Sequence, residues 1–193
     1  MTRLCLSDYR VLIVPGLNNS GADHWQTRWQ QHYRAFERVE QAQWGRPELP
    51  RWSERLAQAL SQSSRPTLIV AHSFGCLTTL HAAGLGEFKL AGALLVAPAD
   101  PEKFGVAQTL RNARLACPAV VIGSTNDPWM TRSRAAAWAG IWGCEFVDAG
   151  ALGHINAESG LGDWPFGLGQ LERLVRTVKT HYRNGSRCGV NRP

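Results

Sequence analysis

Residues 67–75 read Thr-Leu-Ile-Val-Ala-His-Ser-Phe-Gly, and they are the most informative segment for predicting the fold. The continuous apolar run before His72 is typical of a strand that is covered on both faces. After Ser73, apolar and small residues return at helical spacing. A strand that turns sharply into a helix around a serine leaves the hydroxyl exposed at the top of the sheet. The stretch therefore predicts a nucleophile elbow of the GxSxG type, with Ala71 in place of the first glycine.

The alternation of apolar runs and helical segments continues on both sides of the elbow. The strand candidates are residues 11–14, 36–43, 67–71, 93–97, 119–122 and 145–148. Between them, apolar side chains recur every three or four residues, as in Trp25, Trp29 and Tyr33, with Asp23 as the expected N-cap. We predict a single three-layer α/β domain with a parallel sheet of about six strands and helices on both faces.

Length and composition are those of one domain. The chain has 193 residues, of which 44% are apolar, and this is enough for one compact core. We assign residues 1–182 to that domain and predict that residues 183–193 form a basic, disordered tail. Residues 98–118, which follow the fourth strand candidate, are few and hold at most one helix. We therefore expect no cap domain and an open site.

The formal net charge of +6 does not indicate a nucleic-acid partner. Of the 21 basic residues, 18 are Arg, and they are interleaved with acids and form no basic run. No apolar run reaches the length of about 18 residues that would cross a bilayer. Residues 8–10 interrupt the apolar block near the start, which argues against a secretion signal. We expect neither nucleic acid nor a membrane as a partner, and the sequence indicates no protein partner.

The cysteines are odd in number and form no CxxC pair. They are Cys5, Cys76, Cys117, Cys144 and Cys188. This spacing argues against a disulfide framework and against a zinc site. The sequence also has no HExxH motif, no Walker motif and no GxGxxG that leads into a helix. We therefore predict a reducing, cytoplasmic location and no metal or other cofactor.

A serine nucleophile needs a base, and the base needs an acid that holds it in the right tautomer. In this architecture the chain order is serine, acid, histidine, and each residue follows a strand. Asp127 follows the strand candidate at 119–122, and His154 follows the candidate at 145–148. We therefore predict Ser73, Asp127 and His154 as the catalytic residues.

The acid and the histidine each have an alternative interpretation. For His154 it is a loop histidine whose hydrogen bonds are satisfied locally. Asp127 precedes a proline, where Asp commonly opens a turn. Asp100 also follows a strand candidate, one strand earlier than this architecture usually places its acid, and it is the second choice. Asp148 lies at the end of the strand before His154, where a local role is expected. His72 lies on the strand side of the elbow and cannot easily turn back to the neighbouring hydroxyl.

Acyl transfer also requires donors for the developing oxyanion. The first candidate is the backbone N–H of Phe74, immediately after the serine. The second normally comes from the loop after the first strand, here residues 15–21, and we assign it to the N–H of Leu17. A plain Gly- and Asn-rich turn is the alternative interpretation of that loop.

These motifs resemble those of the retinoblastoma-binding-protein-nine-like small serine hydrolases, a compact branch of the α/β-hydrolases. The shared motifs are Pro15-Gly16 with His24-Trp25, His72-Ser73-Phe74-Gly75, Asp127-Pro128 and the block at residues 150–165. The resemblance runs from about residue 11 to about residue 178. It implies hydrolase activity, with the triad on Ser73, Asp127 and His154. The LxCxE motif, through which the animal relative binds its pocket-protein partner, is absent, so that partnership does not transfer.

Four tryptophans fall near the carboxyl ends of the predicted strands, where a substrate would bind. They are Trp25, Trp44, Trp129 and Trp164. As cleft walls they would favour small esters or amides with apolar or aromatic groups, whereas ordinary packing is the alternative for each. The leading function is hydrolysis of such substrates through an acyl-enzyme. A binding protein that retains the fold with little turnover, and an acyltransferase, are the other hypotheses.

Overall fold

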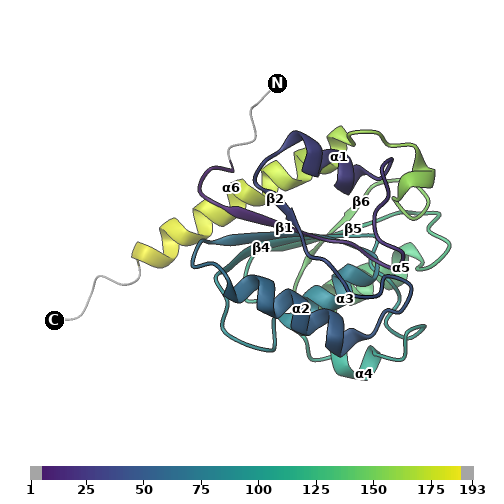
Figure 1. Cartoon of the computed structure of the whole chain (residues 1–193), viewed down its shortest axis with the longest axis horizontal. Coiled ribbons are helices and arrows are strands. Elements are labelled where there is room, and N and C mark those ends of the chain that lie inside the picture. Colours follow the sequence, from purple (N-terminus) through teal and green to yellow (C-terminus); the bar gives the residue numbers. More distant parts are fainter. Residues whose placement is uncertain (1–5, 188–193) are drawn as a thin grey trace.

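The computed structural model describes residues 6–187 and shows one six-stranded, all-parallel sheet (Figure 1). The strands are β1 (Arg10–Val14), β2 (Phe36–Arg38), β3 (Thr67–His72), β4 (Leu90–Val96), β5 (Ala119–Gly123) and β6 (Glu145–Asp148). Their order across the sheet is β2-β1-β3-β4-β5-β6. The predicted fold class is confirmed: a single α/β domain with a parallel sheet.

Helices cover both faces of this sheet. They are α1 (Trp25–His32), α2 (Leu49–Ser61), α3 (Phe74–Ala82), α4 (Ala107–Leu110), α5 (Arg132–Trp142), α6 (Pro165–Arg187) and the 3-10 helix η1 (Ala157–Ser159). Figure 1 shows α1 and α6 on one face, and α2 and α3 on the other.

The two faces of the sheet build two separate apolar cores. Alternate β1 residues point to opposite sides, so Leu12 belongs to the core that includes residues of α2, α3 and α5, whereas Val11 and Ile13 belong to the core that includes residues of α1 and α6. The central strand β3 is buried along its whole length, as its continuous apolar run predicted. Burial on both faces fixes the register of the strands and therefore the height at which each strand ends.

The position of the site follows from the strand order. The chain runs from β1 outward to β2, and then returns to β3 on the other side of β1. The connections after β1 and β3 therefore leave the sheet in opposite directions and open a crevice at the carboxyl ends of the strands, where α/β sheets commonly bind ligands. Ser73 follows β3, and Gly16 and Leu17 follow β1, at this crevice.

Some predicted boundaries were wrong. The strand expected at 36–43 ends at Arg38, because β2 is an edge strand whose one neighbour, β1, ends before Pro15. The N-cap of α1 is His24 rather than Asp23. The boundary predicted at 182/183 falls inside α6, which continues to Arg187, and residues 188–193 of the predicted tail lie outside the described residues.

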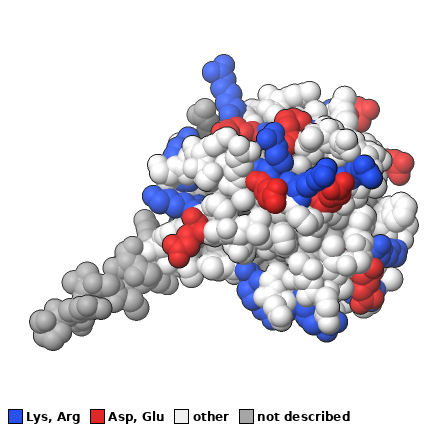
Figure 2. Space-filling model, turned by 60° about the horizontal axis from the view of Figure 1, so that its bottom comes forward, with Lys and Arg blue, Asp and Glu red and all other residues white. Residues whose placement is uncertain are grey.

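The connection after β4 is short, as expected, and its one helix is α4. On the face shown in Figure 2, acidic and basic side chains are interspersed and do not separate by sign. Within residues 6–187, no helix has the length and apolar character needed to span a bilayer.

Candidate active site

Ser73 lies at the turn between β3 and α3 in a backbone conformation that few non-glycine residues adopt. Its φ is 53° and its ψ is −121°, and it is the N-cap residue of α3. The turn is tight because α3 lies directly against β1: a Cβ on Gly75 would be 2.2 Å from the Val14 carbonyl oxygen. A strained backbone at a sharp strand-to-helix turn is the geometry that exposes a serine hydroxyl.

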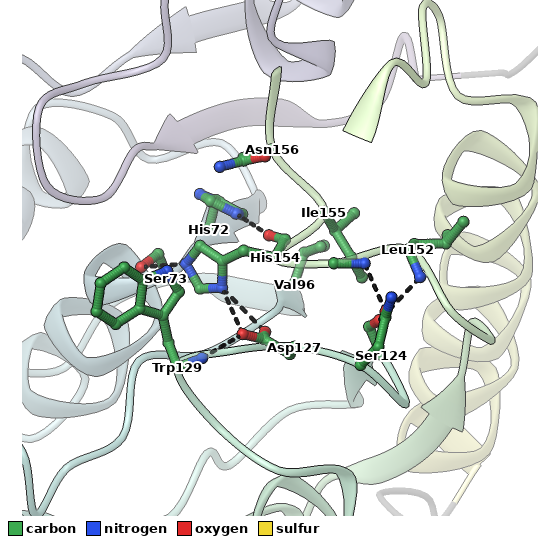
Figure 3. Close-up of polar contacts among 12 residues, drawn as sticks. His72, Ser73, Val96, Ser124, Asp127, Trp129, Leu152, His154, Ile155 and Asn156 are labelled. Carbon is green, nitrogen blue, oxygen red and sulfur yellow. Dashed lines mark hydrogen bonds and ion pairs between the residues drawn. The ribbon is translucent and has the colours of Figure 1, made fainter. Parts of the chain in front are cut away.

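A continuous chain of hydrogen bonds joins Ser73, His154 and Asp127 (Figure 3). The distance from Ser73 Oγ to His154 Nε2 is 2.9 Å. His154 Nδ1 lies 2.9 and 3.1 Å from the two carboxylate oxygens of Asp127. Because a carboxylate can only accept, Nδ1 carries the hydrogen and donates it, which leaves Nε2 free to accept from the serine hydroxyl. The structure thus brings together the three residues predicted from the sequence.

Neighbouring loops hold Asp127 and His154 in place. The backbone N–H of Trp129 donates to Asp127 Oδ1 at 2.9 Å. The Asn126 side chain accepts from the Gly153 N–H at 2.7 Å, and Ser124 Oγ accepts from the Leu152 N–H at 2.9 Å (Figure 3). The loops after β5 and β6 are therefore joined directly, by hydrogen bonds that no sequence pattern indicated.

The alternative acids have other partners. Asp100 is buried and accepts from Arg134 Nε at 2.9 Å and Nη2 at 2.8 Å. Although burial opposes ionisation, the bonds from Arg134 and from the Glu102 N–H lower the pKa of Asp100 overall. Asp148 pairs with Arg132 and accepts from the Gly150 N–H at 2.8 Å, which is the local role we expected. Neither carboxylate bonds to His154.

Two further histidines lie behind the nucleophile. His72 Nε2 lies 2.9 Å from the His154 carbonyl oxygen, which can only accept, so His72 donates there and supports the histidine loop (Figure 3). Burial is the main cause that lowers the pKa of His72 well below its usual value. His24 lies 4.7 Å from His72, between ring centroids, and burial followed by the charge of Arg38 lowers its pKa to about 3. Both rings are neutral at neutral pH.

The loop after β1 meets the amino end of α3. A Cβ on Gly16 would lie 2.7 Å from Ser73 Cβ and 3.2 Å from the Phe74 nitrogen, so a larger residue would not fit. Phe74 is the first residue of α3, whose N–H has no acceptor inside the helix. No backbone acceptor for the Leu17 N–H is found in the part of the chain that the structure describes. Phe74, which carries the first predicted donor, directly follows Ser73 in the chain. Leu17, which carries the second, directly follows Gly16, and Gly16 lies against Ser73.

A cleft of about 380 Å³ opens at Ser73 and His154. Its apolar lining includes Leu17, Phe104 and Trp129, which are three of the six large apolar side chains that are exposed in the described part of the chain. Its polar lining comes from residues of the loops after β1, β4 and β6: Asn18, Asn19, His24, Asp100, Lys103, Asn156 and Glu158. The cleft therefore combines an apolar surface with polar groups near one serine.

Only one of the four predicted wall tryptophans lines this cleft. Trp129 is 57% exposed, and its ring centroid lies 6.4 Å from that of His154. Trp25 and Trp164 are buried in the core beneath α1 and α6, and their ring centroids are 5.0 Å apart. Trp44 packs against Trp52 on the other face. The prediction was wrong for these three because a position after a strand does not reveal whether a side chain turns into the core.

The sequence also missed residues that the fold brings to the cleft. Phe104 comes from the connection after β4, and its ring centroid lies 4.9 Å from that of Phe74, with the two rings tilted by 55°. Lys103 donates to the Trp129 carbonyl oxygen at 2.6 Å. The signal in the sequence that points to Phe104 is an aromatic residue in a short connection after a strand. Within residues 6–187, no group of three or more His, Cys, Asp or Glu side chains is arranged to hold a metal ion.

Comparisons with known proteins show which family and which solved structures the chain is similar to. A family model described as serine hydrolase matches residues 11–173. A crystal structure of a YdeN-like hydrolase from Pectobacterium atrosepticum is 36% identical, with a TM-score of 0.84 over 89% of this chain and 92% of that one. The ydeN gene product of B. subtilis is 18% identical, with a TM-score of 0.70 over 89% and 99%.

A more distant likeness is found in the RedJ thioesterase of Streptomyces coelicolor, which is 14% identical. Its TM-score is 0.58 over 89% of this chain and 86% of that one, so it shares the fold. No curated protein matches the sequence.

Proposed function

Because the chain belongs to the serine hydrolase family, we propose that it hydrolyses small carboxylic esters or amides through an acyl-enzyme on Ser73. The observation that carries the proposal is the hydrogen-bonded chain from Ser73 through His154 to Asp127. The motifs around these residues also favour a place in the retinoblastoma-binding-protein-nine-like branch of the family.

The proposed reaction has two halves. In the first, Ser73 Oγ attacks the substrate carbonyl carbon while His154 Nε2 takes the hydroxyl proton. His154 then gives this proton to the leaving alcohol or amine as its bond to the carbonyl carbon breaks. In the second half, His154 takes a proton from water and the water oxygen attacks the acyl carbon. The bond between Ser73 Oγ and the acyl carbon then breaks, His154 returns the proton to Ser73 Oγ, and the carboxylic acid is released. Asp127 keeps Nδ1 protonated and stabilises the imidazolium in both halves.

The N–H groups of Phe74 and Leu17 would stabilise the oxyanion of each tetrahedral intermediate. Such a donor contributes roughly 3–4 kcal/mol to catalysis, because it is fixed before charge develops. The proposal is supported by the contact of Gly16 with Ser73 and by the absence of a helical partner for the Phe74 N–H.

The lining of the cleft favours substrates with an apolar or aromatic group. Leu17, Phe104 and Trp129 expose apolar surface next to Ser73 and His154. The short connection after β4 leaves the cleft without a cap domain above it. A small ester or amide with one aromatic group would cover this surface, whereas a long acyl chain would extend into solvent.

The central experiment is labelling with a fluorophosphonate together with a turnover panel of oxygen esters, thioesters and amides. We expect the wild-type chain to be labelled and to hydrolyse members of the panel, and Ser73→Ala to lose both properties. Ser61→Ala, an exposed serine in α2, is the matched control and should keep both. Labelling or turnover that persists in Ser73→Ala would refute the assignment.

A further inference from the structure

Arg38, the last residue of β2, makes four hydrogen bonds through its guanidinium group, and none of them goes to a carboxylate. Its Nη1 donates to Asn19 Oδ1 at 2.6 Å and to the Ser20 carbonyl oxygen at 3.0 Å. Its Nη2 donates to Thr27 Oγ1 at 2.7 Å, and its Nε donates to Gln30 Oε1 at 3.0 Å. The partly buried guanidinium group of Arg38 thus links β2 to α1 and also to the loop that follows β1.

The loop that Arg38 holds is folded in an unfavourable conformation. Asn18 and Asn19 both have left-handed backbones, with φ of 63° and 64°. Asn tolerates this region better than most residues, yet a left-handed backbone is unfavourable for it as for every residue with a Cβ. The Asn19 side-chain oxygen also accepts from the Ser20 N–H at 2.7 Å, so it lies between the Ser20 backbone and the Arg38 guanidinium group. The bonds from Arg38 offset the cost of this conformation.

The same loop carries the proposed oxyanion donor. The Asn19 N–H donates to the Gly16 carbonyl oxygen at 3.1 Å and closes a turn that has Leu17 and Asn18 at its centre. One end of this turn, Gly16, lies against Ser73, and the other end, Asn19, is bonded to Arg38. The direction of the Leu17 N–H is therefore fixed between these two anchors.

We propose that Arg38 is a positioning residue of the active site, which holds the turn at residues 16–19 so that the Leu17 N–H points at the oxyanion. This inference rests on the proposed function, because it assumes acyl transfer at Ser73. Arg38 acts through the turn and has no contact with substrate. The shape of its head group matters: a planar fork reaches acceptors on two elements at once, whereas a lysine ammonium cannot occupy those positions together.

The test uses Arg38→Ala and Arg38→Lys in the full chain, with an ester that the wild-type enzyme turns over. Because an oxyanion contact forms only in the transition state, we expect kcat to fall roughly 10- to 100-fold in both variants, with KM changed less than about twofold. An aryl trifluoromethyl ketone, which forms a hemiketal oxyanion on the serine, should lose affinity by a similar factor. Guanidinium chloride at low millimolar concentration should partly restore kcat in Arg38→Ala.

Arg10→Ala is the matched control. The Arg10 guanidinium makes a comparable fork at the amino end of β1, with two bonds to Glu37 and one to the Ala59 carbonyl oxygen. Its loss should lower stability and leave kcat within about twofold of wild type. The thermal midpoints of all variants are measured alongside, so that loss of folding is separated from loss of rate.

The outcomes separate this inference from the proposed function. A folded Arg38→Lys variant with wild-type kcat and inhibitor affinity would overturn it, and so would an effect confined to KM. If Arg38→Ala does not fold, the result for Arg38→Lys decides. Turnover that survives in Ser73→Ala contradicts the proposed function itself. Loss of turnover in Ser73→Ala, with no effect of Arg38, contradicts this inference alone.

Discussion

Asp127 differs from the neighbouring acids in what it contacts. Its side chain is buried, and both of its oxygens face Nδ1 of His154. Asp100 lies after the adjacent strand, β4, but its carboxylate is committed to Arg134. In the sequence, only the position after a strand separates these two acids. In the structure, their hydrogen-bond partners separate them: His154 for Asp127 and Arg134 for Asp100.

Replacing Asp127 with Asn should therefore impair catalysis without removing the side chain. An amide can donate to Nδ1, which favours the tautomer that cannot accept the serine proton, and we expect kcat to fall on the order of 10³- to 10⁴-fold. Asp100→Asn should change kcat less than about tenfold. Steady-state kinetics of both variants on one ester compares the two acids. An equal loss in both would count against Asp127 as the orienting acid.

Trp129 is the residue on which the substrate preference can be tested. Its exposed ring lies at the cleft, and removing about 50 Å² of apolar contact costs roughly 1.3 kcal/mol, or about tenfold in binding. Trp129→Ala should therefore raise KM about tenfold for an aromatic ester and leave KM for an acetate ester nearly unchanged. Phe166→Ala removes another exposed aromatic ring, one that lies outside the cleft, and serves as the control. A similar rise for both esters would contradict an aromatic subsite.

At the scale of elements, the site depends on the close contact of α3 with β1. Gly75 lies in the first turn of α3, and its backbone faces the carbonyl groups that end β1. The spacing of the elbow predicted a small residue here, but not which atoms it would meet. The contact itself sets the direction in which α3 leaves the sheet, and this determines where Ser73 is exposed.

Gly75→Ala should therefore destabilise the whole domain. The added Cβ would lie 2.2 Å from the Val14 oxygen and 2.6 Å from the Pro15 oxygen, and α3 cannot avoid both without moving. We expect a loss of more than about 3 kcal/mol in the free energy of unfolding, measured with urea. Gly140→Ala, at an open position in α5, should stabilise by up to about 1 kcal/mol. Equal stability of Gly75→Ala and wild type would refute the contact.

At the scale of the whole molecule, buried neutral histidines couple stability to pH. The pKa of His24 is about 3 in the folded chain, below its ordinary value of 6.5, and the pKa of His72 is lowered as well. Between about pH 3 and pH 6.5, His24 therefore binds a proton in the unfolded chain but not in the folded chain. The stabilising contribution is therefore complete above about pH 6.5 and is lost as the pH falls.

We expect His24 alone to remove about 2 kcal/mol from the free energy of unfolding between pH 7 and pH 5. His24→Asn should reduce this loss by that amount, because Asn can still cap α1 by accepting from the Gln26 N–H but does not titrate. His181→Asn, at an exposed position, should leave the pH dependence as it is in wild type. Urea unfolding at pH 7 and pH 5 measures the change in the free energy of unfolding for each variant. If His24→Asn loses as much stability as wild type over this range, His24 is not the source of the pH dependence.

The fold class can be predicted from the order of residues along the chain, and so can Ser73, Asp127 and His154, which the structure places in hydrogen-bonding contact. Short stretches of sequence are sufficient for these predictions. Buried parallel strands have a continuous apolar pattern, and the loops that follow them must meet at one edge of the sheet. The strand-turn-helix pattern around Ser73 depends on residues that are close in sequence.

Which side chains face the cleft becomes clear only when the elements are packed together. Trp25 and Trp129 both follow strands, yet one is buried in the core and the other is exposed beside His154. The bonds of Arg38 to the loop after β1, and of His72 to the His154 carbonyl, join residues far apart in the chain. The reason is physical: a side chain's direction depends on the packing of several elements at once, and that packing is not encoded in any short stretch of sequence.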